Sequence, residues 1–447
     1  MKKNPEQLRV EKIVNGGMGL GRLSDGRVCL TPGVLPGELI SVQICDKHKG
    51  VLQAAVKKIL EPSADRTPHP CPLAKTCGGC DLQHCSYPGQ LQIKKHILND
   101  LFTRSGNADV QQAAIQIKEP LSAPQPFHYR QRIRLQVDTY GRPGFRKKAS
   151  HDCIPIRECL LAAPQINDAL ATLMADSGFQ TLLSNSRELE LHLNPGSGRV
   201  TVILHQRRPP RPRDFSLARE LMGSQVTSLP EGLFFLGDNF PLTRADQGTT
   251  PIIFSQHIPP LAGFTDTPLQ LSWEAGGFCQ VNLEQNINLI RTVLEFSHVN
   301  TDETVLDLFC GMGNFSIPLA CNAHEVFGIE GQGAAIRSAT KNAKTAALHN
   351  TSFSKGSIHQ SCHELIKKGQ TFDCVLVDPP RAGIPGLADV LAQLTRQRLI
   401  YVSCDPATLC RDLADLSLQG FTIHTVQPVD MFPQTHHLET VVLLERH

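Results

Sequence analysis

The sequence predicts an α/β protein with a small β-barrel at its N-terminus and a parallel, doubly wound sheet at its C-terminus. The chain has 447 residues, a length that corresponds to about three domains. Residues 1–60 alternate short β-like runs with glycine turns, a pattern typical of OB-like barrels. From about residue 266 short apolar strands alternate with helical stretches, as in Rossmann-like sheets that bind ligands at the carboxyl ends of their strands. We therefore expect three domains, at residues 1–60, 61–265 and 266–447.

The middle of the chain is expected to form a mixed α/β domain, with strands such as Arg132–Val137 and Arg199–His205. Residues 61–90 are rich in proline, cysteine and glycine and show no helix or strand periodicity, so another interaction must stabilise this loop. The arginine- and proline-rich run Arg207–Arg213 is too extended for a helix. We expect it to be a solvated loop, with phosphate contact as the alternative.

The charge of the chain is unevenly distributed, although its formal net charge is only +2. Residues 1–160 contain 24 Lys and Arg against 14 Asp and Glu, a local charge of +10. The remaining residues contain 20 basic and 28 acidic side chains, a local charge of −8. A basic front half joined to an acidic rear half suggests that a polyanion-binding part is attached to a different functional unit.

The sequence predicts a cytoplasmic protein with no membrane segment. No apolar run reaches the roughly 18 residues that a membrane helix needs, and the first residues contain no apolar segment of signal-peptide length. In a reducing compartment the 15 cysteines are not expected to form disulfides. Most of them lie in apolar surroundings and are expected to be small buried hydrophobes; examples are Cys29, Cys45, Cys321, Cys362 and Cys374.

Several cysteines in the loop at 61–90 have the spacing of metal ligands. Cys71 is followed by Cys77 and Cys80, which form one C-x-x-C pair, whereas zinc ribbons usually have two such pairs. Three closely spaced cysteines with one distant cysteine suit a [4Fe–4S] cluster equally well. The candidates for the fourth ligand, among which spacing does not decide, are Cys85, Cys153 and Cys159. The alternative is that these cysteines bind nothing and are buried.

The run Val305–Phe315, VLDLFCGMGNF, predicts a strand, a glycine turn and the start of a helix. Glycines let backbone amides approach a ligand closely at a helix N-terminus. The next strand ends in Glu330, whose carboxylate can accept hydrogen bonds from ribose hydroxyls. An NAD site would need a third glycine where Ser316 stands. S-adenosylmethionine has no pyrophosphate and does not need that glycine.

The next strands are expected to end on the same rim. Asp378–Arg381, DPPR, resembles the target-facing loop of nucleic-acid methyltransferases, although a rigid surface turn is the alternative. Cys404 ends another strand, and Glu439 lies in the C-terminal part of the sheet. A thiolate that attacks C6 of a uracil makes C5 nucleophilic, and a carboxylate can then remove the C5 proton. This pair therefore fits methylation of a uracil at C5.

Two adjacent histidines precede Glu439, and either of them could act as the base instead. His436 and His437 are nevertheless expected at the surface, where such pairs are more often found.

Across nearly its whole length the chain resembles the bacterial RNA 5-methyluridine methyltransferases. Within them it is most similar to the branch that acts on 23S ribosomal RNA and carries an N-terminal TRAM domain and an iron–sulfur cluster. The resemblance rests on motifs in the barrel, the cysteine loop and the C-terminal half: DGRVCLTPGVLPGE, CxxxxxCGGCDLQH, FCQVN at Phe278–Asn282, DLFCGMGNF, DPPRAG, YVSCDPATLCRD and FPQTHHLETVVLL.

The resemblance implies roles for individual residues. Cys404 would be the nucleophile and Glu439 the base. The methyl-donor contacts would be Gln280, Phe309, Asn314, Glu330, Ser357 and Asp378, of which Ser357 stands where the family often has Asn. The cluster ligands would be Cys71, Cys77, Cys80 and Cys159. Asp405 stands beside the nucleophile where the family has Asn, and its charge could raise the pKa of the thiol unless it points away.

The resemblance implies a monomeric enzyme that transfers a methyl group from S-adenosylmethionine to C5 of a uridine in 23S rRNA. The barrel and the basic central region would hold the RNA, and the target uridine would flip into the catalytic pocket. One alternative is the same chemistry at another or a second RNA site, in tRNA or in a dual-site 23S rRNA enzyme. Another is a non-catalytic iron–sulfur protein that binds RNA. A 5-methylcytidine enzyme fits less well, because its Pro-Cys pair is absent from the DPP loop.

Overall fold

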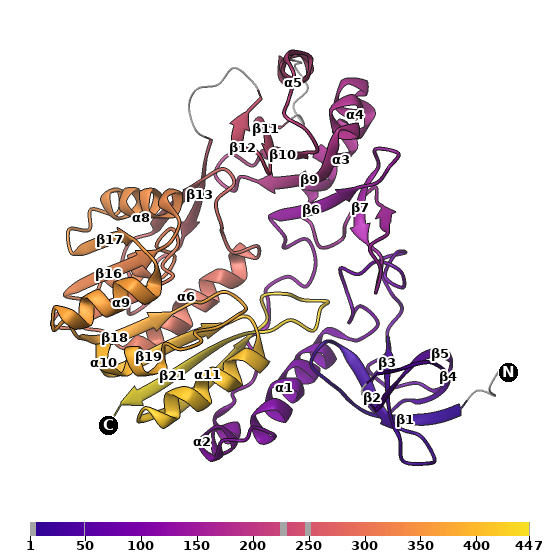
Figure 1. Cartoon of the computed structure of the whole chain (residues 1–447), viewed down its shortest axis with the longest axis horizontal. Coiled ribbons are helices and arrows are strands. Elements are labelled where there is room, and N and C mark those ends of the chain that lie inside the picture. Colours follow the sequence, from indigo (N-terminus) through magenta and orange to yellow (C-terminus); the bar gives the residue numbers. More distant parts are fainter. Residues whose placement is uncertain (1–5, 49, 224–229, 246–251, 447) are drawn as a thin grey trace.

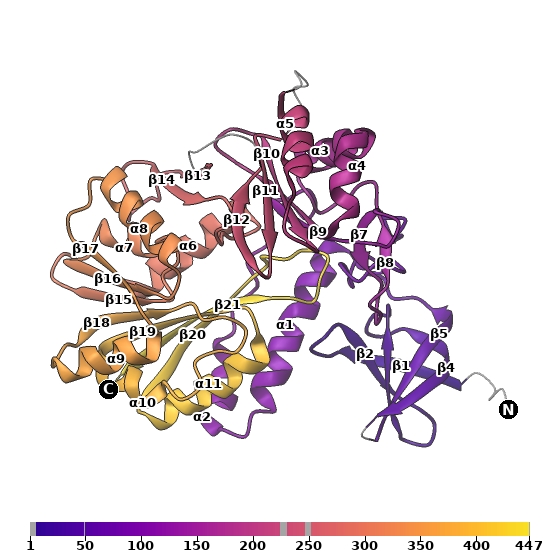
Figure 2. The same ribbon diagram turned by 45° about the horizontal axis from the view of Figure 1, so that its top comes forward.

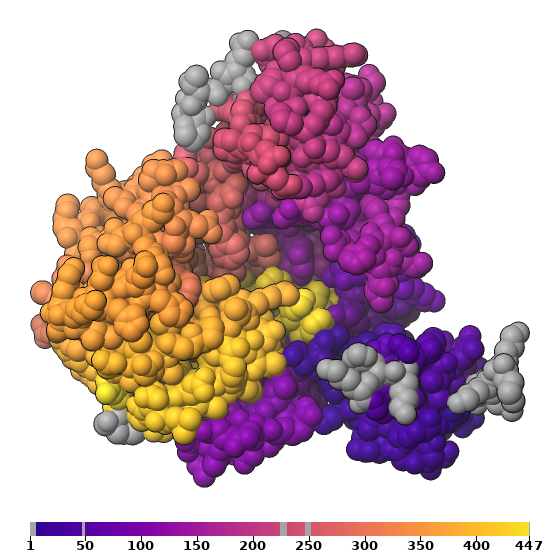
Figure 3. Space-filling model, viewed as in Figure 1, coloured from indigo at the N-terminus to yellow at the C-terminus, as the bar shows by residue number. Residues whose placement is uncertain are grey.

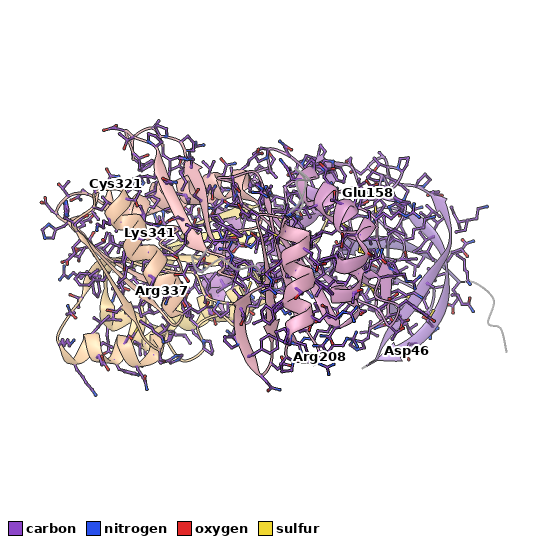
Figure 4. The ribbon with its side chains drawn as sticks, turned by 90° about the horizontal axis from the view of Figure 1, so that it is seen from above. Asp46, Glu158, Arg208, Cys321, Arg337 and Lys341 are labelled. Carbon is purple, nitrogen blue, oxygen red and sulfur yellow. The ribbon has the colours of Figure 1, made fainter. Side chains whose placement is uncertain are left out.

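The computed structural model describes residues 6–48, 50–223, 230–245 and 252–446. The chain forms a β-barrel, a central sheet and a C-terminal sheet (Figure 1). Figure 4 shows the three parts side by side, with Asp46 at the barrel, Arg208 in the central part and Arg337 in the C-terminal part. Among the described residues no helix is long and apolar enough to cross a membrane.

The N-terminal strands close into a barrel with the order β1-β2-β3-β5-β4, which confirms the predicted five-stranded barrel. Burial alternates at the start of β1, where Leu8 and Val10 are buried and Gln7 and Arg9 are exposed, because side chains of a strand point to opposite faces in turn. The strands are β1 (Glu6–Ile13), β2 (Met18–Arg22), β3 (Val28–Pro32), β4 (Leu39–His48) and β5 (Val51–Glu61). Figure 3 shows the barrel as a separate lobe beside the rest of the molecule.

The central part is a seven-stranded sheet of order β12-β11-β10-β9-β6-β7-β8. Apolar side chains of its helices and strands share one hydrophobic core, as expected for a mixed α/β domain. Its strands are β6 (Arg132–Val137), β7 (Pro143–Arg146), β8 (Cys153–Pro155), β9 (Ser186–Leu193), β10 (Val200–Gln206), β11 (Gly232–Gly237) and β12 (Phe240–Arg244). Its helices are α3 (Pro164–Ala175), α4 (Ser177–Ser184) and α5 (Pro212–Gly223).

The C-terminal part is a seven-stranded sheet of order β17-β16-β15-β18-β19-β21-β20. The first five strands are parallel, as predicted, and β21 runs antiparallel to both of its neighbours. The strands are β15 (Thr304–Leu308), β16 (Glu325–Glu330), β17 (Thr351–Lys355), β18 (Phe372–Val377), β19 (Thr395–Ser403), β20 (Phe421–Val429) and β21 (Glu439–Arg446). The helices are α6 (Leu283–Ser297), α7 (Ser316–Ala320), α8 (Gly333–Thr345), α9 (Ile358–Lys367), α10 (Ala388–Leu394) and α11 (Pro406–Leu418). Two hydrophobic cores contain the alternating sets of buried side chains of this sheet.

Segments outside the C-terminal sheet complete its two cores. The helices α1 (Tyr87–Thr103), α2 (Ala108–Gln112) and η1 (Ala113–Gln116) pack near α11 and β20 (Figures 1 and 2). Their buried Leu98, Phe102 and Val110 belong to the same core as Val426. The hairpin of β13 (Ile253–Ile258) and β14 (Leu269–Glu274) joins the other core. The cysteine loop that precedes α1 is therefore tied to the C-terminal part of the chain.

Two expectations about single features need correction or detail. Cys29, Cys362 and Cys374 are buried as predicted, but Cys45 and Cys321 are exposed, so the prediction for these two was wrong. Local apolar sequence does not decide whether tertiary packing covers a side chain. The run Arg207–Arg213 precedes and begins α5, and Asp214 pairs with Arg208 in it.

Candidate active site and cysteine cavity

The carboxyl ends of the parallel strands open into a cavity of about 510 Å³. Ligands of doubly wound sheets bind at this edge. The cavity brings together both predicted catalytic residues and five of the six predicted cofactor contacts: Cys404, Glu439, Gln280, Phe309, Asn314, Glu330 and Asp378. Ser357 is exposed at the N-terminus of α9 and does not line this cavity.

The glycine turn between β15 and α7 has the strained backbone that its sequence indicates. Phe309 adopts φ +65°, which is rare for a residue with a side chain, and its N–H donates to the carbonyl of Ile329 at 2.9 Å. Gly313 adopts φ +86°, and a Cβ there would lie 2.9 Å from Cγ1 of Ile317. Only glycine fits this position. Because glycine has no side chain, the turn can pack closely against α7.

Polar groups on both sides of the turn are held in place by hydrogen bonds. The Glu330 carboxylate accepts from the backbone N–H of Gln332 at 2.8 Å and from that of Gly311 at 3.3 Å. Asn314 exchanges two side-chain hydrogen bonds with Asn286 of α6, at 2.8 and 3.0 Å. A ribose and an amino-acid group could bind at these fixed oxygen and nitrogen atoms.

Cys404 and Glu439 are brought together by strand register. Ser403, the last residue of β19, pairs with Thr440, the second residue of β21. The thiol that follows β19 and the carboxyl that begins β21 therefore reach the same end of the sheet, although 34 residues separate them in the sequence.

The surroundings of this pair favour the protonated forms of both groups. Burial, with a smaller contribution from Asp378, raises the pKa of Glu439 to about 8. Loss of hydration raises the pKa of Asp378 to about 7. Burial and the carboxyls of Glu439 and Asp378 raise the pKa of the Cys404 thiol to about 11. Such shifts are typical of groups that exchange protons in a reaction.

Asp405 points away from the neighbouring thiol and caps a helix. Its carboxylate accepts from the backbone N–H of Thr408 at 2.8 Å, at the N-terminus of α11. The charges that affect the pKa of Cys404 are those of Glu439, Asp378 and Arg381. Asp405 therefore acts as the N-cap of α11, a position that aspartate favours.

Three further side chains that line the cavity were not among the predicted catalytic and cofactor-binding residues, although His437 was considered as an alternative base. Arg381 lowers the pKa of both Cys404 and Glu439. Its position directly after the DPP turn is the sequence feature that could have identified it. Phe278 lines the cavity although 64% of its surface is exposed. His437 lines it too, and burial lowers its pKa to about 4. The expectation that His436 and His437 are surface groups was wrong, because both are partly buried beside Cys404.

A second cavity, of about 530 Å³, contains the four cysteines that the family resemblance singled out: Cys71, Cys77, Cys80 and Cys159. Cys85 is buried in another hydrophobic cluster, and Cys153 lies on β8; neither lines this cavity. Tertiary structure thus separates cysteines that spacing could not separate. Among the described residues no group of three or more His, Cys, Asp or Glu side chains is arranged to hold a metal ion, so the cluster stays a prediction.

The two cavities share a wall made of Arg381, Phe432 and His437. A third, larger cavity of about 1030 Å³ lies between the barrel, the cysteine loop and the central sheet. Its basic lining residues are Arg134, Arg146, Lys147, Lys148 and His151. Gly16 of the barrel lines both this groove and a small cavity that contains Cys404, so the groove leads towards the active site.

Comparison with known proteins gives consistent matches. Residues 264–447 match the family described as tRNA (Uracil-5-)-methyltransferase. The chain is 33% identical over 450 residues to the 23S rRNA (uracil(1939)-C(5))-methyltransferase RlmD of Pseudomonas putida, covering 98% of this chain and 93% of that protein. It is 32% identical over 445 residues to the protein of the same name from Shewanella piezotolerans, covering 98% and 95%.

A solved structure has the same fold. The crystal structure of the Pyrococcus abyssi tRNA (uracil-54, C5)-methyltransferase in complex with S-adenosyl-L-homocysteine superposes with a TM-score of 0.71 at 24% identity. The superposition covers 98% of this chain and 100% of that chain.

Proposed function

The chain belongs to the family of the 23S rRNA (uracil-C5)-methyltransferases RlmD, and we propose that it methylates a uridine of 23S rRNA at C5 with S-adenosylmethionine as donor. The observation that carries this function is the meeting of Cys404 and Glu439 in the cavity that also contains the glycine turn. The relatives are named for uracil 1939, and we propose the equivalent uridine as the target.

The proposed mechanism uses one thiol and one carboxylate. The Cys404 thiolate attacks C6 of the uracil, which makes the ring an enolate with electron density at C5. C5 then attacks the methyl group of the sulfonium, forming the C5–CH₃ bond and releasing S-adenosylhomocysteine. Glu439 removes the C5 proton, and the electron pair of that C–H bond restores the C5–C6 double bond as the Cys404 thiolate leaves.

Arg381 supports the charged states that this mechanism needs. Both the thiolate and the Glu439 carboxylate are disfavoured by burial, and the guanidinium lowers the pKa of each. A cation close to both groups stabilises negative charge when it forms during the reaction.

S-adenosylmethionine is proposed to bind along the glycine turn. Glu330 would accept hydrogen bonds from the ribose hydroxyls, and Gln280, Phe309, Asn314 and Asp378 line the same cavity. Ser357 is retained as a weaker candidate, since binding would have to bring it closer to the cavity.

The four-cysteine cavity fits an anionic group ligated by thiolates. Besides Cys71, Cys77, Cys80 and Cys159 it contains the half-buried Arg130, whose buried Nε–H has no hydrogen-bond partner among the described residues. A thiolate-ligated [4Fe–4S] cluster would carry net negative charge that this guanidinium can offset. We propose that these four cysteines hold such a cluster, and that it braces the loop.

RNA is proposed to bind in the basic groove between the barrel and the central sheet. Arginine and lysine side chains there would contact phosphates, and the target uridine would flip from the RNA into the cavity. We propose that the barrel is a TRAM domain, and that the enzyme acts as a monomer in the cytoplasm, where its rRNA substrate is made.

A second candidate is the same reaction on tRNA, because the matching family description and the superposed structure both name tRNA. Nucleoside mass spectrometry with position mapping on rRNA and tRNA from a deletion strain separates the two. We expect 5-methyluridine to disappear from one 23S rRNA position. Loss from tRNA alone would favour the second candidate, loss at two rRNA positions a dual-site enzyme, and no loss at all a non-catalytic RNA-binding protein.

A further inference from the structure

The loop that joins β20 to β21 forms the wall between the two cavities. It begins after Val429 and ends at Glu439, which pair with each other across the sheet. Between these paired ends Phe432 and His437 line both cavities. The sheet fixes Glu439 itself, but the middle of the loop has no strand pairing among the described residues, so something else must hold the wall.

The middle of the loop is held by residues from the far end of the chain. The backbone carbonyl of Gln434 accepts from the N–H groups of Asp81 and Leu82, at 3.2 and 3.1 Å. The N–H of Gln434 donates to Oε1 of Gln90 at 2.9 Å. Nε2 of Gln90 donates in turn to Oε1 of Gln434 at 3.0 Å. Gln90, on α1, thus bonds to both the backbone and the side chain of a residue 344 positions away.

This contact holds Gln434 in an unfavourable backbone conformation. Gln434 has φ +70°, a region that residues with a Cβ rarely adopt. Both glutamines are buried, with exposed fractions of 1% for Gln90 and 3% for Gln434. A strained residue persists only where its surroundings determine its conformation, and such residues gather at functional sites.

The turn at Gln434 sets the direction of the following residues. His437 comes three residues later, and its ring lies against those of His436 and Phe432, with centroids 4.2 and 6.1 Å apart. We infer that Gln434, held by Gln90, is a positioning residue that places Phe432 and His437 against the uracil while Cys404 attacks it. This inference rests on the proposed function.

The test compares the wild-type enzyme with Gln90→Leu, which removes both hydrogen bonds between the two glutamines and the one from Gln90 to the Cys85 carbonyl. We expect kcat to fall about 10- to 100-fold, because a small misplacement of reacting groups costs that much. KM for S-adenosylmethionine should change less than kcat, because the hydrogen bonds that fix Glu330 and Asn314 do not involve Gln90 or Gln434. Hydrogen exchange of the peptide covering residues 430–438 should become faster. Gln256→Leu is the matched control, since Gln256 is a buried glutamine that bonds to the Leu283 carbonyl elsewhere.

RNA with 5-fluorouridine at the target position gives a second measure of base placement. Fluorine cannot be removed as a cation, so the enzyme remains covalently attached after methyl transfer, and Glu439 plays no part in the measured step. The rate of attachment to Gln90→Leu should fall by the same factor as kcat. If Gln90→Leu fails to fold, Gln434→Gly serves instead, because it permits the positive φ and removes the side-chain bonds to Gln90 and to the Pro126 carbonyl.

Wild-type kcat and attachment rate in a folded Gln90→Leu or Gln434→Gly variant would overturn the inference. So would a loss equal to that of Gln256→Leu, which would indicate a general effect on stability. If the wild-type enzyme itself makes no 5-methyluridine, the proposed function fails instead, and the two failures are therefore distinguishable.

Discussion

The two neighbouring cavities both use cysteine, but in different surroundings. Cys404 stands at the end of a strand beside two carboxyls, Asp378 and Glu439. The four cysteines of the other cavity lie in loops, beside Arg130 and other arginines. Carboxyls next to one thiol give a site that can move protons, whereas several thiols next to arginines give a site that can hold an anionic group. The five cysteines have the same side chain, so the difference between the two sites follows from the residues around each cysteine.

The largest effect should come from removing the thiol of Cys404. We expect Cys404→Ala to lower methylation by ~10⁴-fold or more, since the other two thiols that line the cavity, Cys279 and Cys310, are buried. S-adenosylmethionine binding, measured by calorimetry, should be unchanged. Turnover by Cys404→Ala near the wild-type rate would show that Cys404 is not the nucleophile.

Removing the base should have a smaller and different effect. Glu439→Gln should lower turnover by about 10²- to 10⁴-fold, while the covalent adduct between Cys404 and RNA accumulates. Denaturing gel electrophoresis detects that adduct as a slower-moving protein band. A slow variant without any adduct would assign Glu439 to an earlier step.

The four-cysteine cavity should respond to substitution through its metal content. Cys80→Ser is expected to lose most of the iron, from about four atoms per chain for a [4Fe–4S] cluster. Cys85→Ser, a change outside the cavity, should keep it. Iron and sulfide analysis of anaerobically purified protein checks both variants; stoichiometric zinc without iron would contradict the cluster.

The carboxyls beside Cys404 predict a pH dependence. Glu439 accepts a proton only when ionised, and its pKa is raised to about 8. The rate of C5 proton removal should therefore rise about tenfold per unit as pH increases towards 8 and then level off. Release of RNA from the covalent Cys404 adduct between pH 6 and 9 measures this step apart from ionisation of Cys404, whose own pKa is raised; Glu439→Gln is a control that should lack the dependence. A rate that falls with rising pH in this range would argue against a carboxylate base.

The smallest effects are expected at Asp405. Asp405→Asn should change little, because asparagine caps a helix about as well as aspartate. Asp405→Ala should cost about 1 kcal/mol of stability, measured by chemical denaturation, with nearly unchanged kcat. A large change in kcat for Asp405→Asn would mean that its charge does reach the thiol.

Much of the local structure could be predicted from the sequence. The five barrel strands, the parallel strands β15, β16, β18 and β19, and the glycine turn at Gly311 and Gly313 all occur where their patterns indicate. Alternating burial and turn chemistry act over a few residues, so the sequence displays them directly. The exposed Cys45 and Cys321 were missed because exposure depends on packing between distant segments.

The sequence by itself determined which residues could do chemistry, and the tertiary structure decided which of them meet. Strand register brings Cys404 next to Glu439, and folding of the cysteine loop selects Cys159 over Cys85 and Cys153 as the fourth cysteine of the cavity. The same folding brings Gln90 to Gln434. Contacts between residues hundreds of positions apart leave no local period or spacing, because they form only when whole elements pack together.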